Sequence, residues 1–190
     1  MGEMNLDTDC QMHGSTHPEF LCSDSRKSIT YPYMPPVGII EYVPISNPFM
    51  ALARAYARVQ SRDAVMPGAA VVVKDNRVIG MGANGSDYHS TRQCERVLRG
   101  CKSGEGYELC EGCHPKNHSE RTAVADARNR LGKDAVWFSN LYLWGHWWCC
   151  EPCWEAMNGA GILRVFLLED SEMLFNKEDP HNIVGKQFLE

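Results

Sequence analysis

The alternation of strand-like and helix-like segments after residue 46 constrains the fold of this chain more than any other feature. In chain order the residues predict a helix over 47–62, strands over 68–74 and 77–82, a helix over 118–131, a strand over 140–144, a helix over 150–160 and a strand over 163–168. Strands that alternate with helices are joined by right-handed crossovers, whereas two strands about the polar pair Asp75-Asn76 form an antiparallel hairpin. The pattern therefore predicts a mixed sheet with helices on its faces.

The length of 190 residues suits one domain with a proper core and is too short for two. Residues 1–46 contain prolines that interrupt any helical period, so we expect an irregular N-terminal extension there. Residues 47–190 form the expected folded domain. Within it, residues 83–117 lack any period and contain four cysteines, which predicts a Cys-rich insertion with a functional or metal-binding role.

The composition limits the classes of partner. The longest apolar runs have strand length and fall short of the ~20 residues needed to cross a bilayer. The N-terminus lacks the basic and then apolar pattern of a secretory signal, so we expect a cytoplasmic protein without a membrane partner. The net charge of -5 disfavours nucleic acid and favours a small soluble substrate. Nine cysteines, an odd number, favour metal binding over a disulfide framework.

Two short motifs at predicted helix starts carry the main chemical signal. They are His118-Ser119-Glu120 and Cys150-Glu151-Pro152-Cys153. One His and two Cys side chains suit zinc, and three protein ligands leave a fourth position for water, as in catalytic zinc sites. Glu120 is close enough in sequence to reach that water without binding the metal. We therefore predict His118, Cys150 and Cys153 as ligands of a catalytic Zn²⁺ and Glu120 as the catalytic acid and base.

Two alternatives compete with this reading of the motifs. The zinc site can be closed and purely structural, with Cys149 or another residue as the fourth ligand. The chain can also be a non-catalytic zinc-binding interaction module on the same scaffold. A closed site leaves Glu120 unexplained, because it has no water for a carboxylate to deprotonate. An intact Glu120 also speaks against a non-catalytic module.

The two motifs resemble those of the cytidine and deoxycytidylate deaminase superfamily, and most of all those of deoxycytidylate (dCMP) deaminases. The resemblance covers about residues 47–168 and includes Gly80-Met-Gly-Ala-Asn-Gly85 and the turn Ala160-Gly-Ile162. It implies a three-layer α/β/α sandwich with a mixed five-stranded sheet. It also implies that Asn84 binds the sugar of the substrate, that the protein is a homo-oligomer, and that deoxynucleotide triphosphates are candidate regulators.

The activity that the resemblance implies is hydrolytic deamination of dCMP to dUMP with release of ammonia. The chain departs from the family pattern at Ser119, where Ala is usual, at Cys149, where Pro is usual, and at Ser86, where a Pro-x-Gly continuation is missing. These departures leave other substrates open: a nucleoside, a nucleoside triphosphate, a riboflavin-pathway pyrimidine or a tRNA base.

The insertion holds a second group of candidate metal ligands. The first set that we predict for a second, structural Zn²⁺ consists of four thiols, Cys94, Cys101, Cys110 and Cys113. Mixed sets can include ligands from the N-terminal region or the two nearest histidines: Cys10, His13, His17, Cys22, His89 and His114. Some dCMP deaminases carry such a second zinc, and the alternative is a group of reduced thiols without metal.

Aromatic and basic residues near the motifs are candidates for substrate contacts. The aromatic group before the zinc motif can stack on a pyrimidine or complete a buried strand; it comprises Trp144, His146, Trp147 and Trp148. The basic group in the insertion can meet a 5′-phosphate or form a solvated face; it comprises Arg92, Arg96, Arg99 and Lys102.

Overall fold

The computed structural model describes residues 29–102 and 104–189, and the elements below belong to the unit that begins at Tyr31. The strands are β1 (Ile39–Val43), β2 (Ala69–Lys74), β3 (Arg77–Ala83), β4 (Asn140–Trp144) and β5 (Arg164–Leu168). The α-helices are α1 (Pro48–Gln60), α2 (Tyr88–Thr91), α3 (Glu95–Leu98), α4 (Ser119–Leu131), α5 (Glu151–Asn158) and α6 (Ser171–Phe175). Four short 3₁₀ helices are η1 (Tyr107–Leu109), η2 (Glu111–Cys113), η3 (Pro115–Asn117) and η4 (Asp134–Val136).

The five strands form one mixed sheet in the order β1-β5-β4-β2-β3. β1, β5 and β4 run parallel, whereas β2 pairs antiparallel with both β4 and β3. Asp75 and Asn76 have positive φ values of 47° and 62°, as a two-residue hairpin turn requires. The mixed five-stranded sheet predicted for this chain is confirmed.

One strand lies where the sequence predicted irregular structure. Residues 39–43 form β1, which pairs in parallel with β5 along its whole length from Ile39–Arg164 to Val43–Leu168. The prediction of an irregular segment over 1–46 therefore does not hold for these residues. β1 is an edge strand with every residue partly or largely exposed, so it lacks the alternating burial that marks a strand in a sequence.

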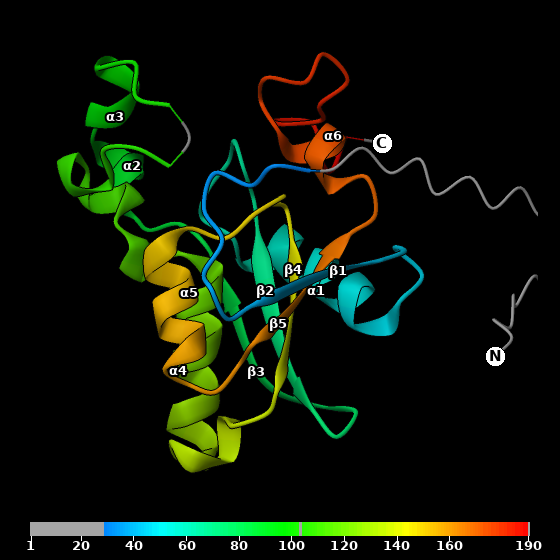
Figure 1. Cartoon of the computed structure of the whole chain (residues 1–190). Helices are drawn as coiled ribbons and strands as arrows, with labels where there is room; N and C mark the ends of the chain where they lie inside the picture. The colour runs from blue at the N-terminus through cyan, green and yellow to red at the C-terminus, as the bar shows by residue number, and fades with distance from the viewer. Residues whose placement is uncertain (1–28, 103, 190) are drawn as a thin grey trace, which may run out of the picture. The chain divides into compact units, whose positions relative to one another are not determined.

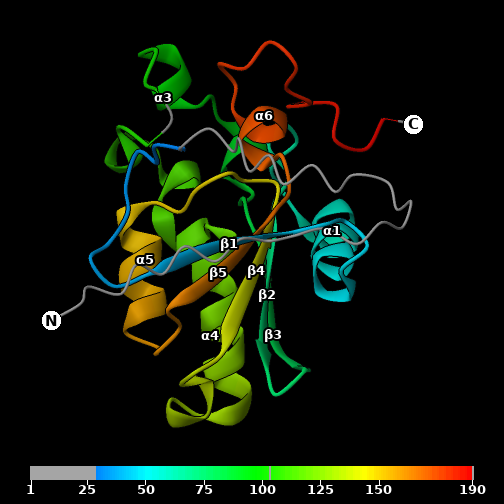
Figure 2. The same ribbon diagram turned by 45° about the vertical axis from the view of Figure 1, so that its right-hand side comes forward.

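Side chains of successive strand residues enter two separate cores, one on each face of the sheet. In β2, Ala70 and Val72 pack with the core under α4 and α5, whereas Val71 and Val73 pack with the core under α1. This alternation follows from the two-residue period of a strand. Figure 2 shows the result, with α1 on one side of the sheet and α4 and α5 on the other, which is a three-layer α/β/α sandwich.

The predicted start of the first helix is confirmed. The Asn47 side chain accepts hydrogen bonds from the backbone N–H groups of Phe49 and Met50 at 3.0 and 3.2 Å. Pro48 occupies the first turn, where its missing N–H costs nothing.

Two glycines in β3 allow α4 to approach the sheet closely. A Cβ atom at Gly80 would lie 2.6 Å from the Ala123 carbonyl oxygen, and one at Gly82 would lie 2.2 Å from the Ala123 nitrogen. No side chain fits between these backbones. The glycines therefore fix how closely α4, which carries Glu120, approaches the sheet.

The Cys-rich insertion between β3 and α4 contains only short helices. It lies at the end of the sheet where α4 and α5 begin, above both helices in Figure 1. α2 and α3 contain no buried residues, and Val97 and Leu98 are largely exposed. The insertion therefore has little apolar core of its own.

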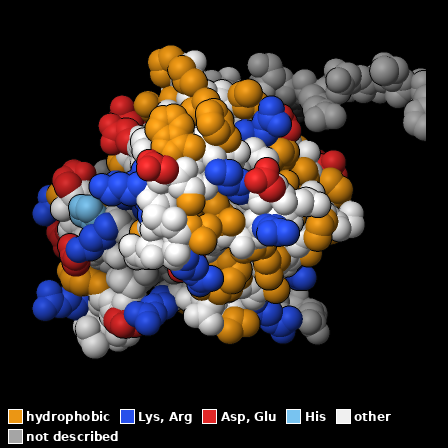
Figure 3. Space-filling view, turned by 90° about the horizontal axis from the view of Figure 1, so that it is seen from below, with side chains coloured by type: hydrophobic (Ala, Val, Ile, Leu, Met, Phe, Trp, Pro, Cys, Tyr) orange, Lys and Arg blue, Asp and Glu red, His pale blue; other side chains and the backbone are white. Residues whose placement is uncertain are grey.

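The surface shown in Figure 3 mixes basic, acidic and apolar side chains rather than gathering one kind of charge. Such a face differs from the clustered basic patch that is typical of nucleic-acid-binding proteins. Among the residues that the structure describes, no helix combines the length and the apolar character needed to cross a membrane.

Candidate metal centres and the adjoining pocket

The first candidate metal centre forms where two helices begin side by side. His118 is the N-cap residue of α4 and Cys150 is the N-cap residue of α5, with Cys153 buried in the first turn. Nδ1 of His118 lies 3.4 Å from Sγ of both Cys150 and Cys153. The three ligand atoms lie within 4.8 Å of one another. This arrangement is called the catalytic cluster below.

These distances fit a tetrahedral zinc ion. Zn–N and Zn–S bonds of about 2.0 and 2.3 Å place neighbouring N and S ligand atoms about 3.5 Å apart. The two measured separations of 3.4 Å match that edge. Cys149 is not among the three members of this cluster, so a tetrahedral ion bound here would have three described protein ligands and one remaining position.

The two thiols of the catalytic cluster titrate differently. A hydrogen bond from Cys153, helped by His118 and opposed by burial, lowers the pKa of Cys150 to about 6. The thiol of Cys153 has a pKa well above its usual value, because it donates that hydrogen bond to Cys150 and is buried. One thiolate is therefore present at neutral pH before any metal binds, which favours metal capture.

Glu120 is buried beside the cluster, with 3% of its surface exposed. The hydroxyl of Ser119 donates to its Oε2 at 3.1 Å. Burial, followed by the charge of Glu120, raises the pKa of Cys149 well above its usual value. Two of the three departures from the family pattern, Ser119 and Cys149, thus lie beside Glu120.

A second group of ligands comes together in the insertion and consists of His89, Cys94, Cys110 and Cys113, called the loop cluster below. Nε2 of His89 lies 3.1 Å from Sγ of Cys110 and 3.9 Å from Sγ of Cys113. Sγ of Cys94 lies 3.5 Å from Sγ of Cys113. In a tetrahedral Cys₃His zinc site, N and S ligand atoms lie about 3.5 Å apart and two S atoms lie about 3.8 Å apart. The measured separations of 3.1 to 3.9 Å span both values.

The loop cluster differs from the predicted four-thiol set at one position. Cys101 follows Gly100, whose φ of 64° turns the chain after α3, and its Sγ lies against Gly106 rather than in the cluster. His89 takes the fourth place because α2 directs it onto Gly112, where a Cβ would lie 2.6 Å from the imidazole. His114 instead accepts a hydrogen bond from the Lys116 backbone at 3.1 Å. The N-terminal candidates Cys10, His13, His17 and Cys22 lie outside the described residues.

Hydrogen bonds prepare one thiol of the loop cluster for metal. Burial opposes ionisation of Cys110, but bonds from His89 and from the backbone of Gly112 and Cys113 lower the pKa of Cys110 to about 6. The described cysteines are all free of disulfides. The loop cluster is therefore chemically suited to bind a metal ion.

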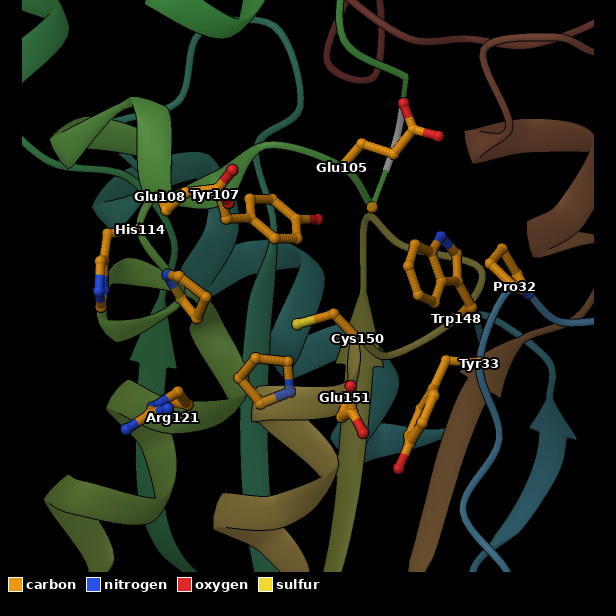
Figure 4. Close-up of a pocket in the computed structure, with 13 residues that line it drawn as sticks. Pro32, Tyr33, Glu105, Tyr107, Glu108, His114, Arg121, Trp148, Cys150 and Glu151 are labelled. Carbon is orange, nitrogen blue, oxygen red and sulfur yellow. The ribbon is translucent and has the colours of Figure 1, made fainter.

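A pocket of about 650 Å³ opens onto the catalytic cluster through Cys150. Figure 4 shows Cys150 near its centre, with Tyr107 and Trp148 to either side of the sulfur and Arg121 across the pocket. Burial, and then the charge of Cys150, raise the pKa of Tyr107 above its usual range, so its hydroxyl remains a donor. The acidic residues that line the pocket are Glu105, Glu108 and Glu151.

Asn84 is 7% exposed and its side chain binds the chain itself. Its Oδ1 accepts from the Ser61 hydroxyl at 2.6 Å and from the Gly68 N–H at 2.8 Å, and its Nδ2 donates to the Met66 carbonyl at 2.7 Å. One amide hydrogen remains for a ligand. Asn84 therefore holds the start of β2 in place.

The aromatic candidates before the zinc motif divide between core and pocket. Trp144 is buried against Phe175 and Phe188, whereas Trp148 lines the pocket. Burial lowers the pKa of His146, so this ring is neutral. Tyr107 was not predicted, because a lone aromatic residue in an aperiodic segment carries no sequence signal.

The loop arginines do not line the pocket. Arg92 lies over the Tyr88 ring, Arg96 donates to the carbonyls of Glu105 and Lys102, and Arg99 pairs with Glu95. Arg121 does line the pocket, and the described residues contain no ion pair for it. Its position directly after Glu120 is the signal that would have identified it.

The fold and the two helix-start motifs define a zinc site of the deaminase type. The sequence matches the family described as the cytidine and deoxycytidylate deaminase zinc-binding region over residues 45–169, and the chain belongs to this family. The match includes every member of the catalytic and loop clusters. Zinc is accordingly the metal that the catalytic cluster is suited to hold.

Several solved deaminase structures are similar to parts of the chain. Guanine deaminase from Bacillus subtilis is 23% identical, with a TM-score of 0.39, over 63% of this chain and 60% of that protein. The apo dCMP deaminase of cyanophage S-TIM5 is 20% identical, with a TM-score of 0.42, over 65% of this chain and 82% of that protein. The chain thus spans less than two thirds of the guanine deaminase. Curated protein sequences gave no match.

Proposed function

We propose that this protein is a zinc-dependent hydrolase that removes the amino group from a cytosine-type base, with dCMP as the first candidate substrate. The observation that carries the proposal is the meeting of His118, Cys150 and Cys153 within tetrahedral distances beside a buried Glu120. Three ligands and an adjacent carboxylate suit a catalytic zinc better than a closed structural one.

When bound, the zinc ion supplies a Lewis acid that makes water a nucleophile near neutral pH. The residues of the chain handle the protons. Glu120 takes a proton from the attacking water, delivers one to N3 of the base, and assists the departure of ammonia from C4. The Ser119 hydroxyl, 3.1 Å from Oε2, orients the Glu120 carboxylate for these transfers.

The pocket suggests how the substrate is held. Tyr107 and Trp148 offer aromatic faces for a pyrimidine ring near Cys150. We propose Arg121 in place of the loop arginines as the cation for a 5′-phosphate, since it lines the pocket without an ion-pair partner in the described part of the chain. The remaining amide hydrogen of Asn84 is our candidate for the sugar contact.

A nucleoside is the second candidate substrate, and the charge of the pocket favours it. Glu105, Glu108 and Glu151 line the pocket against the single cation Arg121. A phosphate dianion would be repelled by these carboxylates, whereas an uncharged deoxycytidine would not.

The deciding experiment measures ammonia release from a panel of cytosine compounds. If dCMP is the substrate, its kcat/KM exceeds that of deoxycytidine, and Arg121→Ala reduces this preference mainly by raising KM for dCMP. Arg92→Ala is the matched control, because Arg92 lies over Tyr88 outside the pocket. Equal kcat/KM values for the two compounds would favour the nucleoside, and no turnover of any cytosine compound would refute the proposed function.

The loop cluster is our proposed site for a second, structural zinc. Its four ligand atoms lie within 4.8 Å of one another and its distances fit a Cys₃His site. Metal analysis tests this proposal: we expect two zinc ions per chain, and one after Cys110→Ser.

A further inference from the structure

We propose that metal binding at the loop cluster orients His118 for the catalytic metal, through the backbone carbonyl of Cys113. The inference rests on the proposed function only in that both clusters bind zinc. It makes Cys113 a positioning residue for the catalytic cluster and couples the two metal sites.

The link between the clusters is a single hydrogen bond on the far side of the His118 ring. Nε2 of His118 lies 3.3 Å from the carbonyl oxygen of Cys113, while Nδ1 faces the Cys150 and Cys153 sulfurs. Because a carbonyl only accepts, Nε2 carries the proton and Nδ1 is left with a lone pair for metal. A second-sphere bond of this kind fixes both the tautomer and the ring orientation of a metal-binding histidine.

The loop cluster determines where this carbonyl lies. Sγ of Cys113 is 3.5 Å from that of Cys94 and 3.9 Å from Nε2 of His89, so a metal there would hold Cys113 directly. The chain then reaches His118 through η3, whose Asn117 side chain donates to the carbonyls of Glu111 and Gly112. Movement of the loop cluster would therefore move the carbonyl that orients His118.

A second contact joins the insertion to the same imidazole. The Tyr107 ring meets His118 edge to face at a centroid distance of 4.9 Å. The Arg96 guanidinium, two residues after Cys94, lies 4.3 Å from the Tyr107 ring centroid. His118 is thus held by two groups that the insertion supplies.

Metal would stabilise this arrangement because the helices of the insertion bury little apolar surface. α2 and α3 have no buried residues, and the described cysteines form no disulfide. A segment with so little apolar burial depends on metal–ligand bonds to overcome its conformational entropy. Loss of the loop metal is expected to free Cys113 before it disturbs the sandwich.

The test removes one loop ligand and measures how firmly the catalytic zinc is held. His89→Ala should reduce zinc from two ions per chain to one, and the remaining ion should transfer to a chromophoric chelator about 10- to 100-fold faster than from the parent. Alkylation followed by mass spectrometry shows which cysteines the remaining ion protects, and we expect these to be Cys150 and Cys153. The Nε2–H signal of His118 in histidine-selective NMR should shift or broaden.

Two further variants are matched controls. Cys101→Ser changes a loop thiol outside the cluster and should keep both ions and the parental release rate. His89→Cys restores a fourth ligand and should recover slow release. If His89→Ala does not fold, Cys94→Ser removes a ligand from the opposite side of the cluster and is read in the same way.

The outcomes separate this inference from the proposed function. Release of the catalytic zinc within twofold of the parent, after loss of the loop ion, would overturn the coupling. A parent that holds only the catalytic ion would overturn it as well. Absence of ammonia release from any cytosine compound would refute the proposed function, while the chelator rates would still decide the coupling.

Discussion

Replacing Glu120 with Gln tests the proposed mechanism with the smallest change of shape. The side chain is 3% exposed, so a larger change would disturb packing as well as chemistry. Gln keeps an oxygen that can accept from Ser119, but it cannot take or give a proton at neutral pH. We therefore expect the variant to fold and to keep the catalytic zinc.

The expected loss of activity follows from the role of the carboxylate. General acid–base catalysis raises reaction rates by about 100- to 10,000-fold. At about 1.36 kcal/mol per tenfold in rate, this corresponds to about 2.7–5.4 kcal/mol of activation free energy. The loss should reach the upper end, because one carboxylate serves several proton transfers and the acidic residues that line the pocket are all exposed. The assay is ammonia release under saturating substrate, with zinc content and the melting temperature measured on the same sample.

The matched control is Glu108→Gln, which neutralises a carboxylate of the pocket lining without touching the proton path. It should retain activity within a few-fold. Glu120→Gln with activity within tenfold of the parent, and zinc intact, would refute the assignment of Glu120 as acid and base.

Three further predictions concern charge, packing and selectivity. In protein stripped of metal, the rate at which iodoacetamide modifies Cys150 should fall as the pH drops through about 6. The reason is that a thiol with its pKa lowered to about 6 is a thiolate above that pH and a less reactive thiol below it. A midpoint of the rate near pH 8.5 would contradict this prediction. Gly82→Ala should destabilise the fold by about 1–3 kcal/mol, because the new Cβ would lie 2.2 Å from the Ala123 nitrogen. An unchanged melting temperature would contradict this prediction and show that α4 can move away from β3. Arg121→Ala should narrow the preference for dCMP over deoxycytidine, and a larger effect from Arg92→Ala would return the phosphate site to the insertion.

Local chemistry made several features predictable from the sequence. Asn47 and Pro48 start a helix through their own side chains, and Asp75-Asn76 form a tight turn through their own backbone angles. Cys150 and Cys153 share one helical turn, so their spacing alone brings their sulfurs to one place. Each of these features depends on residues within four positions of one another.

Other features required the tertiary structure. β1 pairs with β5, which lies more than a hundred residues away in sequence, so no local period marks it. The choice of His89 over Cys101 depends on how α2 packs against Gly112, and the bonds of Asn84 depend on Ser61 and Met66. In each case the partner lies in a distant segment of the chain, and a sequence pattern records a residue's own tendencies but not which partner folding brings to it.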